Sequence, residues 1–175
     1  MRVLALDTST PATTCALLED EQVVWEKTVE GKAGDVLPAA LGDPRAFDAI
    51  AVGLGPGSFT GLRVGLAAAK ALAYARKLPI AGASSLQAIA LDRPGLVHAA
   101  TEARKGELFV QTFQDGQARG PVQIVMAADL PEKPLLIPPP ARNVARLCLP
   151  RLLGAAYDVQ ACFALAPDYV QGFPR

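Results

Sequence analysis

The chain has 175 residues, of which 51% are hydrophobic, so it can bury a sizeable core in one domain or two small ones. Its 17 basic and 17 acidic residues cancel, and no basic run stands out, which argues against independent tight binding to nucleic acid. Three scattered cysteines without a Cys-x-x-Cys pair indicate reduced, mostly buried thiols of a cytoplasmic protein, and the first residues predict a strand rather than a signal peptide or a membrane span.

The first quarter of the chain predicts a β-meander followed by a short helix. Strands are expected over Arg2–Leu6, Thr13–Leu18 and Gln22–Val29, because each is an apolar or alternating run bounded by polar turns. A helix is expected over Asp35–Leu41, with Pro38 tolerated in its first turn.

A glycine-rich turn between a buried strand and a long helix is the most informative stretch. Ala49–Val52 is a short apolar run, which predicts a strand covered on both faces. Ser58 is placed to cap the helix that follows, and this helix is expected to run to about Lys77. Glycine permits φ values that a side chain forbids and proline fixes its own φ, so the residues that shape the turn are Gly55, Pro56 and Gly57.

Two nucleotide-binding motifs do not match this turn. A Rossmann fingerprint needs Gly or Ala at its sixth position, where the two possible frames place Ser58 and Thr60, and no acidic residue follows the next strand. A P-loop needs a Lys at the start of the helix, and none is there. From spacing alone, the remaining interpretation is a tight turn that shapes the fold.

Small residues recur at every fourth position of the long helix, at Gly61, Gly65, Ala69 and Ala73. Such a stripe lets another helix approach closely, at a cost of about 1 kcal/mol for each Gly relative to Ala. The neighbour is either part of the same domain or a helix of another chain, and the sequence leaves both open.

The next elements complete a mixed sheet. Pro79–Gly82 predicts a strand, and Ser84 or Ser85 can cap a helix that runs to Leu91. The coarse order is then β-β-β-α-β-α-β-α. This order indicates a mixed sheet with helices on its faces.

The remainder of the chain predicts a second, shorter set of elements. Strands over Leu96–Thr101 and Glu107–Phe113 are expected to form a hairpin about Arg104-Lys105-Gly106. Beyond this hairpin we expect two more strands and a final helix, over Val122–Val125, Leu135–Ile137 and Ala141–Leu153.

Few residues suggest chemistry. Asp7, Thr8 and Ser9 follow the first strand, where they form either an Asx turn or a loop that faces a phosphate or its metal. His98 is the single histidine of the chain and lies in a strand pattern, so no metal site is predicted. Ser58 does not lie in a nucleophile elbow, and no catalytic residue is assigned.

Several motifs together resemble the TsaB (YeaZ) family of the glycoprotease-like (Gcp-like) superfamily. The opening M-R-V-L-A-L-D-T-S-T and the block G-P-G-S-F-T-G-L-R at Gly55–Arg63 carry most of the resemblance. Thr101–Phe109 is similar to the family's D-A-R-x-G-E-V-Y, and Ala166–Gln171 to its P-x-Y-L-R, with Gln171 where Arg is usual.

The resemblance implies an α/β fold of the actin/Hsp70-like (ASKHA, ribonuclease H-like) type. Such a fold has two related halves, each a mixed sheet flanked by helices. Here the halves would be residues 1–97 and 98–175, with the second half reduced and its last helix packing back on the first.

The resemblance also implies a non-catalytic partner. Family members bind the catalytic subunit TsaD in the complex that transfers a threonylcarbamoyl group to the tRNA adenosine next to the anticodon. A TsaE-type ATPase is expected to join through the complex, the chain is expected to form a homodimer when alone, and tRNA is contacted only indirectly. The residues implied in the partner interface are Ser58, Phe59, Thr60, Gly61, Leu62, Arg63, Gly65 and Ala69.

A second function stays open. The chain could be a nucleotide-binding enzyme or switch of the actin/Hsp70 type that acts alone. The loop at Asp7, Thr8 and Ser9 lacks the Gly found in active phosphate loops of the superfamily, which argues against this alternative. No intrinsic cofactor is expected, and a nucleotide at the partner interface is left open.

Overall fold

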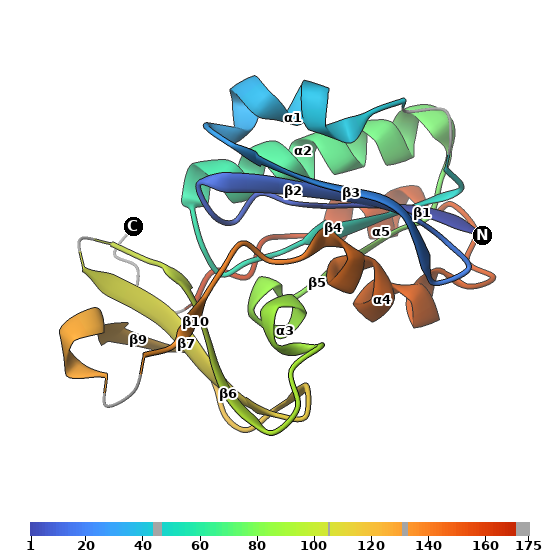
Figure 1. Cartoon of the computed structure of the whole chain (residues 1–175). Helices are drawn as coiled ribbons and strands as arrows, with labels where there is room; N and C mark the ends of the chain where they lie inside the picture. The colour runs from blue at the N-terminus through green and yellow to red at the C-terminus, as the bar shows by residue number, and fades with distance from the viewer. Residues whose placement is uncertain (44–46, 105, 131–132, 171–175) are drawn as a thin grey trace.

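Two β-sheets with helices packed against them make up the protein (Figure 1). The structure is a computed structural model that describes residues 1–43, 47–104, 106–130 and 133–170. The first sheet has the strand order β3-β2-β1-β4-β5, in which β1, β2 and β3 are antiparallel neighbours and β4 and β5 run parallel to β1. Its strands are β1 (Arg2–Asp7), β2 (Ala12–Glu19), β3 (Gln22–Glu30), β4 (Ala49–Gly53) and β5 (Ile80–Ala83).

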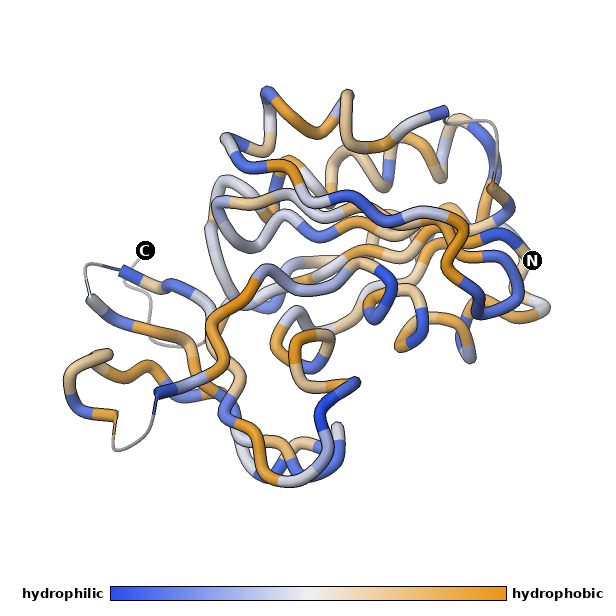
Figure 2. Tube along the Cα trace, in the orientation of Figure 1, coloured by the Kyte–Doolittle hydropathy of each residue, from blue (hydrophilic) through white to orange (hydrophobic). Residues whose placement is uncertain are grey.

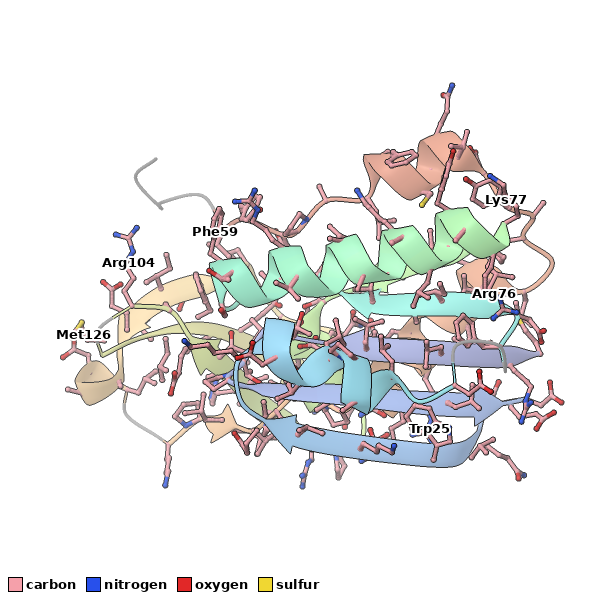
Figure 3. The ribbon with its side chains drawn as sticks, turned by 90° about the horizontal axis from the view of Figure 1, so that it is seen from above. Trp25, Phe59, Arg76, Lys77, Arg104 and Met126 are labelled. Carbon is pink, nitrogen blue, oxygen red and sulfur yellow. The ribbon has the colours of Figure 1, made fainter. Side chains whose placement is uncertain are left out.

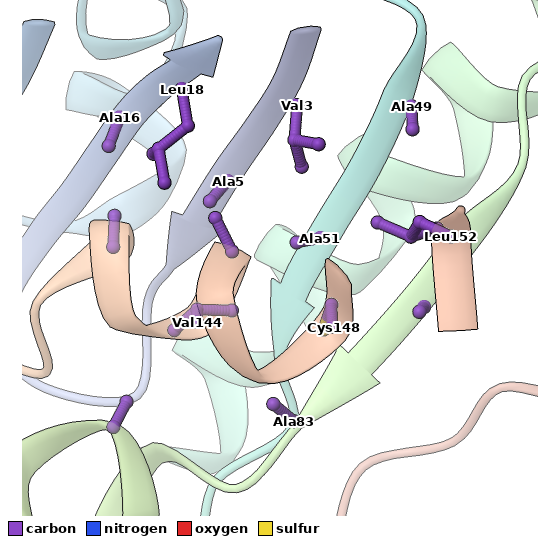
Figure 4. Close-up of a cluster of buried hydrophobic side chains, with 14 residues drawn as sticks. Val3, Ala5, Ala16, Leu18, Ala49, Ala51, Ala83, Val144, Cys148 and Leu152 are labelled. Carbon is purple, nitrogen blue, oxygen red and sulfur yellow. The ribbon is translucent and has the colours of Figure 1, made fainter. Parts of the chain in front are cut away.

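Helices cover both faces of the first sheet. Successive residues of β1 point to opposite faces, so Leu4 and Leu6 meet one set of helices while Val3 and Ala5 meet another. The first face is covered by α1 (Ala33–Leu41), α2 (Phe59–Arg76) and α5 (Val159–Ala164). The second is covered by α4 (Ala141–Leu152), whose contact with the sheet is shown in Figure 4.

The second sheet repeats the pairing of the first four strands. β6 and β7 are antiparallel, β9 pairs antiparallel with β7, and β10 runs parallel to β6. The helix α3 (Ser85–Ala90) packs against this sheet through Leu86 and Ile89. The strands are β6 (Leu96–Glu102), β7 (Glu107–Gln114), β8 (Gln117–Ala118), β9 (Gln123–Met126) and β10 (Leu135–Leu136), and a 3₁₀ turn, η1, spans Ala127–Asp129. The prediction of a mixed α/β, actin/Hsp70-like fold is therefore confirmed.

One edge of the first sheet is protected against pairing with another strand. The edge strand β3 is largely exposed and carries hydrophilic residues along its middle, among them Glu26 and Lys27 (Figure 2). Charged residues on an edge strand oppose strand addition by another chain. This edge of the sheet is therefore poorly suited to adding a strand from another chain.

The predicted elements are present, with small differences in their bounds, and β8 and η1 were not predicted. Helix α1 begins at Ala33, two residues earlier than predicted, so Pro38 lies inside the helix and not in its first turn. Helix α5 was not predicted, because six residues are too few to show a helical period. Lys105 of the predicted hairpin turn and Gln171 of the last motif lie outside the described residues. Within the described part of the chain, no helix is long and apolar enough to cross a membrane.

The three cysteine thiols, Cys15, Cys148 and Cys162, are buried. Burial raises the pKa of Cys15 to about 12 and that of Cys148 to about 12, and it also raises the pKa of Cys162. A thiol with a raised pKa stays protonated and unreactive near pH 8. We therefore expect Ellman's reagent to label none of the three in the folded protein and all of them after unfolding in guanidinium. A thiol that reacts within seconds in the native protein would contradict this burial.

Candidate functional site

The turn between β4 and α2 is held in place from both sides. Gly55 has a φ of +92°, and the Gly55–Pro56 peptide bond is cis. The backbone N–H of Ser58 donates to the carbonyl of Ser9 at 2.7 Å, and that of Ser85 donates to the carbonyl of Gly55 at 2.8 Å. The hydroxyl of Ser58 accepts from the N–H of Gly61 at 3.1 Å and so caps α2, as predicted.

A buried carboxylate joins this turn to the end of β1. Oδ1 of Asp7 accepts from the N–H of Ser9 at 2.8 Å and from its hydroxyl at 2.6 Å. Oδ2 accepts from the hydroxyl of Ser85 at 2.5 Å, and this hydroxyl in turn accepts from the N–H of Gly55 at 3.0 Å. Burial raises the pKa of Asp7, and the hydrogen bonds from Ser85 and Ser9 oppose that shift. The Asp7 carboxylate therefore connects the loop after β1, through Ser85, to the turn at Gly55.

The end of β1 and the loop that follows it lie directly against glycines of β4, of the turn and of α2. A Cβ on Gly53 would lie 1.8 Å from Oδ2 of Asp7, and one on Gly57 would lie 2.2 Å from the carbonyl oxygen of Ser9. A Cβ on Gly61 would lie 2.1 Å from the carbonyl oxygen of Thr8. These distances leave room only for a hydrogen atom at each position. No residue other than glycine therefore fits there without a shift of the neighbouring atoms.

This close packing does not fit phosphate or metal binding by the loop. Asp7, Thr8 and Ser9 are each at most 1% exposed. Both oxygens of the Asp7 carboxylate already accept hydrogen bonds, and the hydroxyl of Thr8 donates to the carbonyl of Gly61 at 2.8 Å. Among the described residues, no group of three His, Cys, Asp or Glu could hold a metal ion. The side chains of Asp7, Thr8 and Ser9 are thus buried and engaged by the chain's own groups.

The small-residue stripe of α2 faces the protein's own interior, which corrects part of the partner interface that the resemblance implied. Gly61, Leu62, Gly65 and Ala69 are buried. A Cβ on Gly65 would lie 2.1 Å from Oγ1 of Thr8. The neighbour that needs the small residues is therefore the loop after β1 together with the first sheet, so a partner cannot reach these four residues in the folded chain.

The other predicted interface residues lie at the surface near the start of α2. Ser58, Phe59, Thr60 and Arg63 are exposed. The guanidinium of Arg63 lies 5.2 Å from the centre of the Phe59 ring, within the range of a cation–π contact. This part of the predicted set remains available to a partner.

A second stripe, which was not predicted, lies on the opposite side of α2. Thr60, Ala67 and Ala71 lie on one side of the helix and are exposed, and Tyr74 lies next to them. Their spacing was visible in the sequence, but alanines at that spacing do not show which side is buried. Viewed from above, α1 lies beside α2 over the first sheet (Figure 3). The exposed residues of both helices therefore lie on the side that faces away from this sheet. We define the α1–α2 face as Asp35, Pro38, Ala39, Thr60, Arg63, Ala67, Ala71 and Tyr74.

Neither residue considered for catalysis lies in a catalytic arrangement. Nδ1 of His98, on β6, lies 2.9 Å from the hydroxyl of Thr112 on β7, which makes a cross-strand pair. Ser58 serves as the helix cap described above. These two side chains have structural roles in the described part of the chain.

The chain is similar to proteins of one family across most of its length. Residues 34–159 match the family model described as "TsaD: tRNA N6-adenosine threonylcarbamoyltransferase". An uncharacterised protein of Mycobacterium tuberculosis is 39% identical over 148 residues, which cover 77% of this chain and 69% of that relative. The "tRNA threonylcarbamoyladenosine biosynthesis protein TsaB" of Bacillus subtilis is 33% identical over 127 residues, which cover 65% of this chain and 56% of that protein.

The TsaB protein of Escherichia coli is 34% identical, and the match covers 55% of that protein. The chain thus spans about half the length of the TsaB relatives that it matches. Among solved structures, YeaZ from Pseudomonas aeruginosa superimposes with a TM-score of 0.77 and 23% identity, over 97% of this chain and 99% of that chain. At 23% identity, this similarity shows that the two proteins share a fold and nothing about function.

Proposed function

Since the chain belongs to the TsaB (YeaZ) family, we propose that it is a non-catalytic scaffold in tRNA threonylcarbamoyladenosine biosynthesis that binds a TsaD-type catalytic subunit. The observation that carries this proposal is the α1–α2 face, on which exposed alanines of a long helix permit the close approach of a second polypeptide. Phe59 and Tyr74 stand at the two ends of the exposed stripe and offer apolar anchors.

The closed loop at Asp7 supports a non-catalytic role. Related folds bind phosphates where a first strand ends, whereas here that place is filled by the chain's own turn. A loop that is closed in this way is consistent with a chain that acts by binding another protein. An interface of ordinary stability buries about 1,200–2,000 Å² in total, which two neighbouring helices can supply.

A bulky charge on the α1–α2 face tests the proposal. Ala67→Arg and Ala71→Arg are each expected to weaken binding of the TsaD-type subunit at least about tenfold, because the side chain holds the two surfaces apart. Both positions are exposed, so the free energy of unfolding is expected to change by no more than about 0.5 kcal/mol. Binding is measured by calorimetry with the TsaD-type protein encoded in the same genome.

Ala118→Arg is the matched control, because Ala118 is an exposed alanine on β8, in the second sheet. Equal binding by Ala67→Arg, Ala71→Arg and Ala118→Arg would show that the partner docks elsewhere. A wild-type chain that does not bind the TsaD-type subunit at all would overturn the proposed function itself.

In this proposal the α1–α2 face forms both the homodimer and the complex with the TsaD-type subunit. A surface that is complementary to itself permits a homodimer about a two-fold axis, so homodimer and complex would compete for the α1–α2 face. The TsaE-type ATPase then joins through the complex, and tRNA is contacted chiefly by the catalytic subunit. In this proposal, Ala67→Arg disrupts the homodimer as well as the complex.

The alternative, a nucleotide-driven enzyme or switch that acts alone, makes a different prediction. It requires ATP turnover by the purified chain and loss of that turnover in Asp7→Asn. The scaffold proposal expects hydrolysis no faster than the buffer background in both proteins, because Asp7 is engaged with Ser9 and Ser85.

A further inference from the structure

Four aromatic side chains form two exposed pairs along the side of α2 that faces away from α1. Phe59 is 56% exposed, Tyr74 49%, Phe163 59% and Tyr169 51%. The ring of Phe59 lies 5.5 Å from that of Tyr169, and the ring of Tyr74 lies 5.8 Å from that of Phe163. Large aromatics at such exposure, gathered along one side of a helix, mark a surface that meets another molecule.

Two cations accompany these pairs. The guanidinium of Arg63 lies 5.2 Å from the Phe59 ring, and the ammonium of Lys77 lies 4.2 Å from the Tyr74 ring. Within the described ranges, neither cation forms an ion pair. We call Phe59, Arg63, Tyr74, Lys77, Phe163 and Tyr169 the aromatic–cation flank. Phe59 and Lys77 mark its two ends in Figure 3.

The flank is preorganised, because the C-terminal segment that supplies two of its four rings is hydrogen-bonded to α2 and to Leu54, which follows β4. The ammonium of Lys70 donates to the carbonyl of Phe163 at 2.9 Å. The N–H of Asp168 donates to the carbonyl of Leu54 at 2.8 Å, and Cys162 of α5 is buried. The rings are thus held in position before any partner arrives, which lowers the entropic cost of binding.

The chemistry of the flank favours a protein over a single-stranded nucleic acid. A platform for bases needs aromatic faces that are open for stacking. Here Phe59 contacts Arg63 and Tyr169, and Tyr74 contacts Lys77 and Phe163, so both rings are already engaged. Aromatic edges beside unpaired cations suit the rim of a protein interface with carboxylates opposite.

We propose that the aromatic–cation flank extends the docking surface onto an acidic part of the same TsaD-type partner, an inference that rests on the proposed function. Arg63 and Tyr74 belong to both the flank and the α1–α2 face, so one partner can cover the two surfaces without a gap. Lys77 caps the end of α2, fourteen positions after Arg63, so the partner presents two carboxylates about 21 Å apart. The cations attract these carboxylates before contact and then pair with them.

Charge reversal tests the flank. Arg63→Glu combined with Lys77→Glu is expected to slow association with the TsaD-type subunit about tenfold at about 50 mM salt, with a much smaller difference at about 500 mM, because salt screens the attraction. The matched control is Arg93→Glu with Arg119→Glu, two exposed cations outside the flank that give the same change in net charge. Association rates are measured by stopped flow, and thermal unfolding confirms that both variants are folded.

The outcomes separate this inference from the proposed function. If the flank variant associates as fast as wild type while Ala67→Arg still binds more weakly than wild type, the flank is not part of the interface and the proposed function stands. If both charge variants slow association equally, net charge alone is responsible and the inference fails. If the flank variant loses affinity for tRNA but associates normally with the partner, the surface contacts RNA and the inference is likewise overturned. A wild-type chain that does not bind the partner overturns both.

Discussion

Gly61→Ala is expected to lower the free energy of unfolding by about 2–3 kcal/mol, although alanine is the better helix former. The added Cβ would lie 2.1 Å from the carbonyl oxygen of Thr8, and a backbone oxygen cannot turn aside as a flexible side chain can. To make room, the loop after β1 has to shift, and with it Ser9, whose N–H and hydroxyl donate to Asp7. Urea unfolding followed by circular dichroism measures the loss.

Gly34→Ala is the matched control for this substitution. Gly34 also lies inside a helix, but no heavy atom lies within 4 Å of the position that its Cβ would take. The change is therefore expected to stabilise the protein by up to about 1 kcal/mol through helix propensity alone. If Gly61→Ala were stabilising to the same degree, the close contact between α2 and the loop would be refuted.

The same contact changes how substitutions in the small-residue stripe are to be interpreted. If the small-residue stripe met a helix of another chain, Gly65→Leu would abolish assembly while leaving the fold intact. In the structure a Cβ at this position would lie 2.1 Å from Oγ1 of Thr8, so Gly65→Leu is expected to destabilise the monomer itself. Ala67→Arg is the cleaner probe of docking.

Asp7→Ala is expected to cost about 3 kcal/mol or more of unfolding free energy. The change leaves the hydroxyl of Ser85 and both donors of Ser9 buried without their acceptor, and each unsatisfied buried donor costs about 1–3 kcal/mol. Asp7→Asn is the matched variant, since its amide oxygen can accept from Ser9 and its NH₂ can donate to Oγ of Ser85. We expect it to retain most of the stability, and equal losses in both variants would contradict a hydrogen-bonding role.

The pH dependence of the two proteins gives an independent test. Burial raises the pKa of Asp7, so the folded protein holds this proton to a higher pH than the unfolded chain does, where the carboxyl titrates at about 3.9. The stability that comes from the protonated group is fully present below the unfolded pKa and is lost as the pH rises through the folded pKa. Wild type should therefore lose stability relative to Asp7→Asn across that window, and parallel pH profiles would rule out the raised pKa.

The sequence determined the local features of this protein. The apolar run Arg2–Leu6 predicted a strand, the short apolar run Ala49–Val52 predicted a strand covered on both faces, and Ser58 after the glycine-rich turn predicted a capped helix. The pairing of β6 with β7 likewise followed from two apolar runs separated by a short turn. Each of these features depends on residues a few positions apart, whose geometry is set by backbone sterics and by hydrogen bonds within one element.

Only the tertiary structure decided which surfaces are free. A helical period shows that Gly61, Gly65 and Ala69 share one side of α2, but not whether a second chain or the loop after β1 lies against it. The carboxylate of Asp7 is closed off by Ser85, 78 residues further along the chain, and no spacing rule connects them. These contacts decide which residues can take part in function. A side chain that is already packed or hydrogen-bonded within the fold is not available to bind a partner or a ligand.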